Sequence, residues 1–384
     1  MGNRTNLLFM VDWLNFLAIF AKKTTIMHSI RTCLTVAAIA ATMFYGCRST
    51  APDLLTLDVL ELSGADTLTA WTLDRSVRPA ESFELAPDRV LGYAALRGYD
   101  GSLLMGFRGD SIFWAGPDGR FTTVFSRKGR GPQEYLSSEP LLDPEGRILV
   151  LDVMQRRAYT YLPDGTFVSR QDSVNYADVH FFPDGSRAVI EMPSMKGTRI
   201  FSVLAPDGSV LRNGPSRVEN GWVVLGHYNF FAQTDGSCYL KNDNIDSLYH
   251  LYPDRTEVEA VLRKPAKPAD TVQNDEDGSF SIQTNYGRFI DRSCVVFGHL
   301  LFYSVRDDEK KVTHHFVCDL RSGEMLFHGH KAPLLRVGDR DVRTWPVYVK
   351  GRDAWCKLTR ADASALIDGY DDESNDAYLH ITLR

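Results

Sequence analysis

The sequence has few cysteines, and none of them are spaced as a metal or redox motif. There are six in 384 residues. Beyond Cys47 they are far apart, at Cys238, Cys294, Cys318 and Cys356. No CxxC pair exists, which argues against a zinc or dithiol site. Each of the four lies in an apolar, strand-like run, where a buried thiol is the simplest state. The alternative is a disulfide, which could form in an oxidising compartment.

Long apolar runs, a basic excess and familiar catalytic motifs are also missing. No run of eighteen apolar residues follows position 47, so no membrane-spanning helix is expected there. The net charge is −6, and residues 47–384 alone hold 39 basic and 48 acidic residues. A nucleic-acid binder needs a clustered basic face, so nucleic acid is excluded as a partner. HExxH, GxSxG, P-loop and dinucleotide-binding patterns are absent.

Helical periodicity is nearly absent too, and short strand-like runs take its place. The clearest stretch is Phe125–Gln171, which contains the four apolar runs Glu139–Asp143, Arg147–Asp152, Arg157–Leu162 and Thr166–Gln171. Turn residues such as PEG and PDG separate the runs, because Gly adopts positive φ and Asp tolerates it. Four antiparallel strands at this spacing form one blade of a β-propeller.

Two interleaved series of turns extend this pattern along the chain. Turns between first and second strands are expected at Gly101, Gly146, Gly185 and Gly236. Turns between third and fourth strands are expected at Gly119, Gly165, Gly208 and Asp254. An α/β fold would need helices between the strands. The two series therefore predict an all-β repeat protein.

The series predicts six blades of four antiparallel strands in one domain, residues 54–384. The expected blades span about 89–127, 139–171, 176–213, 222–263, 280–331 and 342–384, with a surface loop at 264–278 and a short helix near 361–367. The sixth blade lacks a fourth strand of its own. An N-terminal strand, Leu54–Leu62 or Leu68–Leu73, is expected to supply it and close the ring.

The first 46 residues are predicted to be a signal segment. Arg31 precedes an apolar run from Leu34 to Gly46, and Cys47 follows it. Cys47 is the predicted lipid-bearing residue, and residues 47–53 form a tether. Residues 1–26 contain another apolar run, which would be redundant ahead of a complete signal segment. Met27 is therefore the expected start of the protein. An uncleaved anchor helix is the alternative.

One mouth of the predicted channel gathers polar side chains. The crossover GRGPQEY and two corners between second and third strands should meet there and bring together Arg130, Gln133, Arg156, Asn242, Asp243, Asn244 and Asp246. Such a rim suits a polar ligand or a peptide loop. For GRGPQEY itself the favoured interpretation is structural, in which Gly and Pro turn the chain and Tyr135 packs inward; the binding rim is the functional interpretation of the same segment.

Histidines on one predicted hairpin raise the question of a metal. With a two-residue turn at Ser322-Gly323, His315 faces His330, and His328 shares their side of the sheet. Three imidazoles can bind one metal ion. These are outer strands, however, where polar residues simply meet solvent. No metal or cofactor is therefore predicted.

The repeat resembles an NHL-type repeat through Gly129, Gly131, Pro132, Tyr135, Asp152 and Arg157. With Cys47, the DGS turns and the terminal LHITLR, the chain resembles six-bladed NHL- or TolB-like propeller lipoproteins of Bacteroides-type bacteria. This resemblance implies a lipid-anchored protein of the cell envelope. No acidic export run follows Cys47, which favours a periplasm-facing position.

Two functional classes follow from this resemblance. The favoured one is a non-enzymatic binding or scaffold module for a partner protein or glycan. The alternative is a metal-dependent hydrolase or lyase of the lactonase-like type, whose channel would need Glu, Asn and Asp ligands from several blades. Asn242, Asp243, Asn244 and Asp246 come from one corner only.

Overall fold

The structure is a computed structural model, and residues 54–384 form one of its two units. It describes residues 54–64, 77–84, 94–99, 102–107, 111–116, 120–137, 139–192, 199–215, 218–219, 222–223, 228–242, 245–265, 271–274, 280–283, 287–337, 340–371 and 376–383. The predicted signal segment, the tether and Cys47 lie outside these ranges. No helix within them has the length and apolarity needed to cross a membrane.

Four sheets of the described chain each contain four consecutive antiparallel strands. The first has β3 (Ala94–Tyr99), β4 (Ser102–Phe107), β5 (Ser111–Ala115) and β6 (Phe121–Phe125). The second has β7 (Glu139–Leu142), β8 (Ile148–Asp152), β9 (Arg157–Tyr161) and β10 (Phe167–Asp172). The third has β11 (Tyr176–Phe181), β12 (Arg187–Glu191), β13 (Phe201–Leu204) and β14 (Val210–Asn213). A further sheet has β23 (Phe289–Phe297), β24 (Leu300–Asp307), β25 (Val312–Asp319) and β26 (Met325–Gly329).

A nine-stranded sheet contains two more four-stranded antiparallel groups. One consists of β17 (Tyr228–Ala232), β18 (Cys238–Asn242), β19 (Ser247–Leu251) and β20 (Thr256–Arg263). The other consists of β29 (Pro346–Lys350), β30 (Asp353–Lys357), β31 (Ala377–Leu383) and β2 (Val77–Glu84). A single parallel pair, Ala232 with Lys350, joins the two groups.

The last group takes its fourth strand from the N-terminal part of the domain, but from a segment that the sequence did not indicate. β2 pairs with β31 from Val77 opposite Leu383 to Glu84 opposite Ala377. The expected segment Leu54–Leu62 instead contains β1 (Leu55–Asp58), which pairs in parallel with β20. Leu68–Leu73 lies outside the described residues. The β2 sequence, VRPAESFE, contains a proline and several charged residues. An outer strand tolerates them, but they break the apolar alternation by which a strand is recognised in a sequence.

Three two-stranded hairpins account for the errors in the predicted blade boundaries. They are β15 (Val218–Glu219) with β16 (Trp222–Val223), β21 (Thr271–Asn274) with β22 (Phe280–Gln283), and β27 (Leu334–Val337) with β28 (Arg340–Arg343). The sequence predicts β16, β22 and β28 as parts of blades and residues 264–278 as a loop, whereas these strands form separate hairpins and β21 lies within 264–278. Alternating apolar residues identify a strand but not its partner, so the local pattern could not separate hairpins from blades.

Two short helices complete the described elements, α3 (Val59–Gly64) and α4 (Arg360–Leu366). The second confirms the predicted helix near residues 361–367. Thr359 caps its N-terminus and accepts a hydrogen bond from the Asp362 backbone N–H at 3.1 Å.

The predicted turn glycines are confirmed wherever they are described. Gly146, Gly165, Gly185, Gly208 and Gly236 all have φ between 76° and 89°. In each of these turns the preceding Asp carboxylate, or Asp143 in the PEG turn, accepts backbone N–H groups. Gly101 and Gly119 lie outside the described residues.

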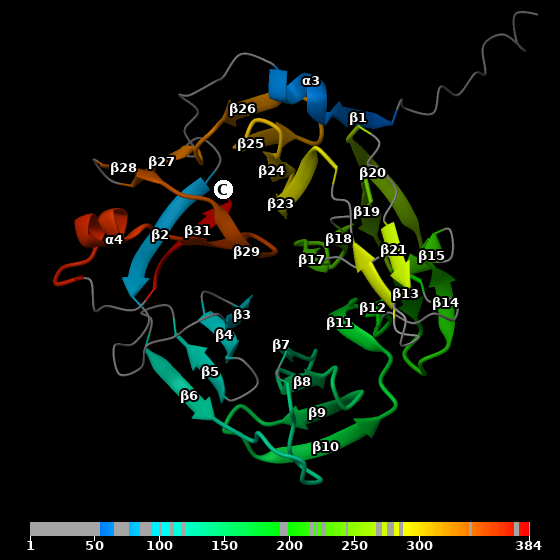
Figure 1. The fold of residues 1–384 in the computed structure, drawn as a ribbon. Helices are drawn as coiled ribbons and strands as arrows, with labels where there is room; N and C mark the ends of the chain where they lie inside the picture. Colours follow the sequence, from blue (N-terminus) through cyan, green and yellow to red (C-terminus); the bar gives the residue numbers. More distant parts are fainter. Residues whose placement is uncertain are drawn as a thin grey trace, which may run out of the picture. The chain divides into compact units, whose positions relative to one another are not determined.

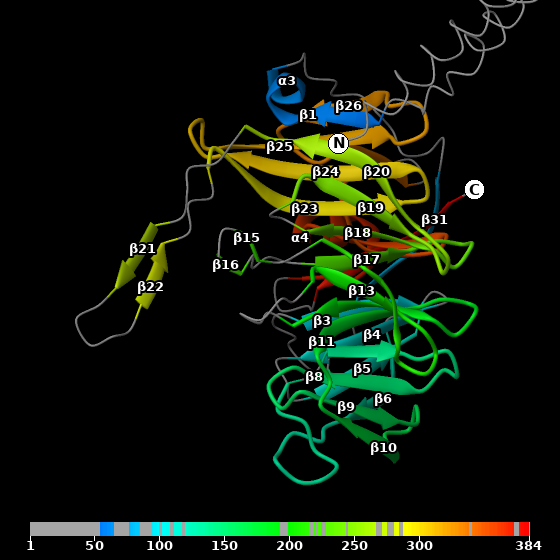
Figure 2. The ribbon, with the colours of Figure 1, turned by 90° about the vertical axis from the view of Figure 1, so that its right-hand side faces the viewer.

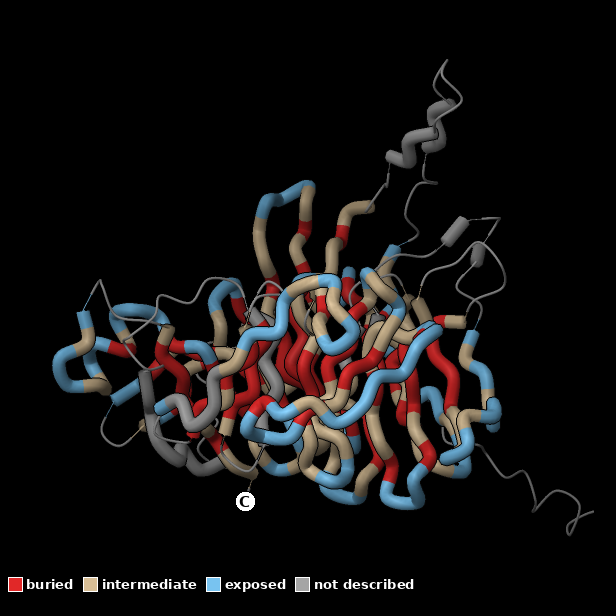
Figure 3. Tube along the Cα trace, turned by 90° about the horizontal axis from the view of Figure 1, so that it is seen from below, coloured by how far each residue is buried: buried red, intermediate tan, exposed pale blue. Residues whose placement is uncertain are grey.

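The first strands of the groups lie nearest a common centre in Figure 1. There β3 contacts β7 and β29, and β17 contacts β11, β23 and β29. In Figure 2 the strands run across the view, so the turns gather at two ends. Buried residues follow the strands, whereas exposed residues follow turns and outer strands (Figure 3). Antiparallel four-stranded sheets with their first strands around a centre make the architecture that of a β-propeller.

Candidate functional site

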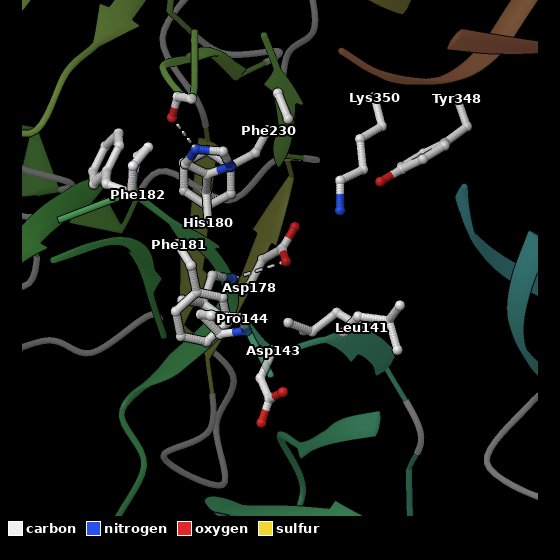
Figure 4. Close-up of a pocket in the computed structure, with 15 residues that line it drawn as sticks. Leu141, Asp143, Pro144, Asp178, His180, Phe181, Phe182, Phe230, Tyr348 and Lys350 are labelled. Carbon is white, nitrogen blue, oxygen red and sulfur yellow. Dashed lines mark hydrogen bonds between the residues drawn. The ribbon is translucent and has the colours of Figure 1, made fainter. Parts of the chain in front are cut away.

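A cavity of about 270 Å³ lies among the innermost strands β7, β11, β17 and β29. Pro144, Pro183 and Gly236, from turns between first and second strands, also line it. The cavity therefore lies toward the end of the strands where these turns gather. Figure 4 shows its side chains converging from several sheets. Each of the four strand groups contributes only two to six residues, so no single segment of sequence contains the site.

His180, on β11, is held in place by a hydrogen bond and an aromatic contact. Its Nε2 lies 2.9 Å from the carbonyl oxygen of Gly236, and its ring packs edge-on against Phe182 at a centroid distance of 5.1 Å. Because a carbonyl can only accept, Nε2 carries the proton and donates. Burial lowers the pKa of His180 to about 4, so the ring is neutral at pH 7. Nδ1 is then left as a hydrogen-bond acceptor.

Charged groups of both signs line the cavity. Asp178 lies two residues before His180 on β11, and Tyr348 and Lys350 lie two residues apart on β29. Figure 4 shows Lys350 and Tyr348 reaching in from the side opposite Asp178. Asp143 also lines the pocket, but its carboxylate holds its own turn and binds Arg147 Nε at 2.7 Å.

The predicted rim lies at the opposite end of the strands from this pocket. Arg130 and Gln133 are exposed in the crossover from β6 to β7, and Arg156 is exposed at the corner between β8 and β9. The Arg156 guanidinium donates to the Asn175 side-chain oxygen. None of the three lines the cavity. A binding role for them stays a prediction.

The crossover GRGPQEY has a clear structural role. Tyr135 is fully buried, and its backbone N–H donates to the Arg127 carbonyl at 2.9 Å. The Gly131 N–H donates to Glu134 Oε2 at 2.7 Å. Asp152, nearly fully buried, accepts from the Leu136 and Gln155 backbone N–H groups. The residues that resemble a repeat motif therefore hold the crossover against the corner.

Of the corner predicted at Asn242–Asp246, the structure describes the ends. Asn242 closes β18, whereas Asp243 and Asn244 lie outside the described residues. Asp246 lies 3.7 Å from Lys264 Nζ. That ammonium is 2.8 Å from Asp291 Oδ2, which Lys241 Nζ approaches at 3.3 Å. Asp246 thus borders a buried ion network between two sheets.

The histidine hairpin has a different register from the one expected. His315 pairs with Gly329 rather than His330, because the turn is longer than two residues and a bulge follows Val317. His314 therefore shares a face with His328, and His314 Nδ1 lies 3.0 Å from His328 Nε2. His315 packs instead against Trp345. In the described chain, no group of three or more His, Cys, Asp or Glu residues is placed to hold a metal ion.

Sequence reasoning missed the pocket for a recognisable reason. Its residues belong to inner strands such as YADVHF and PVYVK, where a His, an Asp or a Lys looks like ordinary alternation. The sequence feature that could have indicated the pocket is an ionisable residue on the first strand of a repeat, close to the turn that leads to the second strand. Asp178, His180 and Lys350 all satisfy it.

Comparison with known protein-family models finds no match, and neither does comparison with curated proteins. Solved structures do match. One is a protein of Bacteroides fragilis named as a candidate exported protein, with 13% identity, a TM-score of 0.54, and coverage of 86% of this chain and 99% of that one. A DUF4221 family member from Bacteroides vulgatus shares 7% identity, with a TM-score of 0.48 and coverage of 80% and 98%.

Virginiamycin B lyase from Staphylococcus aureus shares 9% identity, with a TM-score of 0.40 and coverage of 79% of this chain and 99% of the lyase. At such identities only the likeness to the Bacteroides fragilis protein bears on the fold. It agrees with the architecture described above and says nothing of activity or ligand.

Proposed function

We propose that this protein is a lipid-anchored envelope protein whose six-bladed β-propeller binds a small ligand without transforming it. The pocket between the innermost strands of four strand groups carries this proposal. It combines an apolar lining with a few polar groups of fixed position, which is the usual character of a small-molecule site. The six four-stranded groups and the pairing of β2 with β31 support a ring of six blades closed by an N-terminal strand.

A cavity-filling variant tests the binding function. Ala232 lines the pocket, and Ala232→Leu should occupy part of it. We expect small metabolites that raise the melting temperature of the full-length chain to lose this effect in the variant. Ala361→Leu, on the exposed side of α4, is the control. Ligand effects that are equal in both variants would refute the pocket as the site.

The envelope position rests on Arg31, the apolar run and Cys47. The absence of an acidic run after Cys47 favours the periplasmic side. Cells fed labelled palmitate should label the wild-type chain and not Cys47→Ser. Label retained by the variant would refute the anchor. A partner protein or glycan at the Arg130 and Arg156 rim remains a separate expectation.

A catalytic role has no comparable support. A lactonase-like site needs several acidic or amide ligands around one metal. Among the described residues, no group of three or more His, Cys, Asp or Glu residues is placed to hold one. Binding is therefore the function that the geometry supports best.

A further inference from the structure

Three connecting segments meet on the surface at the end of the strands opposite the pocket. They are residues 126–137 between β6 and β7, residues 153–156 between β8 and β9, and residues 173–175 between β10 and β11. The Gln155 side-chain amide donates to the Glu134 carbonyl at 3.3 Å and joins the first two segments. The Val174 backbone N–H donates to the Arg156 carbonyl at 2.9 Å and joins the last two. The three segments therefore form one continuous surface, which we call the corner surface.

Arginines without a carboxylate partner distinguish the corner surface. Arg127, Arg130 and Arg156 are exposed, and none of them takes part in an ion pair within the described chain. The Arg156 guanidinium donates to the side-chain oxygen of Asn175, which is neutral and does not compensate its charge. In contrast, the arginines of the adjacent strands β9 and β10 both pair with Asp172. Three uncompensated positive charges therefore lie together on a protein whose net charge is −6.

Met154 adds an apolar side chain to this surface. It is 73% exposed, the largest exposed fraction among the large apolar residues of the described chain. Single exposed apolar residues are common on protein surfaces, so Met154 alone would indicate nothing. Arg and Met together, however, are enriched where one protein contacts another. The corner surface therefore has the residue types of a protein-binding surface.

The backbone of the corner surface is unusual at two positions. Arg156 and Ser173 have φ of 55° and 61°, and they are two of the three non-glycine residues with positive φ among the described residues. Glycine adopts this left-handed region without the steric cost that a Cβ brings. A glycine at position 156 would therefore suit the fold at least as well. An arginine there keeps a guanidinium on the surface, which suits binding rather than folding.

We propose that the corner surface binds an acidic segment of a partner protein, whose carboxylates pair with Arg127, Arg130 and Arg156 and whose apolar side chain packs on Met154. A guanidinium forms two parallel hydrogen bonds with a carboxylate, and a neutral glycan has no group that matches them. This surface lies outside the pocket. The proposal therefore goes beyond the binding of a small ligand and does not depend on it.

Two synthetic peptides with blocked ends test the proposal on the purified full-length chain. The acidic peptide GEELEEG has four carboxylates around a leucine, and GQQLQQG replaces each carboxylate by a neutral amide. Fluorescence anisotropy of the labelled peptides measures their affinities. We expect the acidic peptide to bind about tenfold more tightly than the neutral one, because several exposed charge pairs each contribute a small amount. This advantage should shrink as salt is added, since exposed charges are screened.

Substitutions on the corner surface assign the binding to residues. Arg127→Gln, Arg130→Gln and Arg156→Gln should each weaken the acidic peptide by about threefold and leave the neutral peptide unchanged. Met154→Ser should weaken both peptides, because both contain the leucine. Arg156→Gly removes the charge together with the left-handed Cβ, so it should weaken the acidic peptide without lowering the melting temperature.

Lys311→Gly is the matched control for Arg156→Gly. Lys311 is exposed, has φ of 57° and lies in the turn between β24 and β25 of another sheet. The change removes a positive charge and a left-handed Cβ away from the corner surface, and both peptides should bind as they do to the wild type. Ala232→Leu should also leave peptide binding unchanged, so failure of this site and failure of the pocket are distinguishable.

Three results would overturn the proposal. The first is equal affinity for the acidic and neutral peptides. The second is an Arg156→Gly variant that melts at a lower temperature but binds the acidic peptide as the wild type does, because Arg156 would then hold the corner together. The third is binding of phosphatidylglycerol vesicles that the arginine substitutions weaken, with no binding of the acidic peptide. The corner surface would then be a membrane contact.

Discussion

Replacing Asp291 by asparagine should destabilise the protein more than any exposed charge substitution. Its side chain is 2% exposed and lies against two ammonium groups, Lys241 Nζ at 3.3 Å and Lys264 Nζ at 2.8 Å. The Tyr303 hydroxyl donates to the same carboxylate. Lys241 belongs to β18, Lys264 directly follows β20, and Asp291 and Tyr303 belong to β23 and β24, so the network joins two neighbouring sheets.

The expected magnitude follows from burial. Removing one partner of a buried ion pair costs about 3–5 kcal/mol, because the other charge stays buried without compensation. Lys241 is the lysine most affected, since its side chain is 1% exposed. Lys264 retains Asp246 at 3.7 Å. For domains of this size or somewhat smaller, 1 kcal/mol corresponds to about 2 °C. The melting temperature should therefore fall by about 6–10 °C.

Thermal unfolding followed by circular dichroism measures this change. The double variant Asp291→Asn with Lys241→Met should recover more than half of the loss, because the uncompensated charge is replaced by an apolar chain of similar length. Asp308→Asn removes a carboxylate from exposed pairs with Lys311 and Arg306 and should change the melting temperature far less than Asp291→Asn does. A loss of 2 °C or less in Asp291→Asn, or no recovery in the double variant, would refute the reasoning.

Three further predictions concern stability. Burial and the neighbouring His330 and His328 lower the pKa of His314 to about 4, below its value in the unfolded chain. The unfolded chain therefore binds more protons than the folded chain between about pH 6.5 and 4, and the free energy of unfolding should fall as the pH is lowered through that window. His314→Phe should make this fall smaller in urea titrations, and an unchanged profile would contradict the assignment; His180 and His315, whose pKa values are also lowered to about 4, contribute the rest of the fall. Gly236→Ala should cost more than Gly146→Ala in the same urea assay, because both have positive φ but only at Gly236 would a Cβ lie 2.4 Å from Pro183, and equal losses would count against it. A chain that starts at residue 85 lacks β1, α3 and β2 and should aggregate, measured by light scattering. A chain that starts at residue 65 lacks β1 and α3 but keeps β2, and it should stay soluble; the reverse order would show that β2 is not the essential outer strand.

The sequence by itself determined the local structure. The four strands of Phe125–Gln171 and the turn at Gly236 follow from residues within a few positions of one another, since Gly supplies positive φ and Asp holds the turn N–H groups. The fold class follows from the period of these turns. Tyr135 was expected to pack inward, and it does, for the same local reason.

Only the tertiary structure decided which strands pair and which side chains meet. A strand pattern does not identify its partner strand, so β2 was overlooked. A register shift of one residue likewise places His314, instead of His315, on the face of His328. The pocket brings together Asp178 and His180 from β11 and Lys350 from β29, which are about 170 residues apart in the chain. Their proximity depends on where β29 lies relative to β11, and no local preference encodes that position.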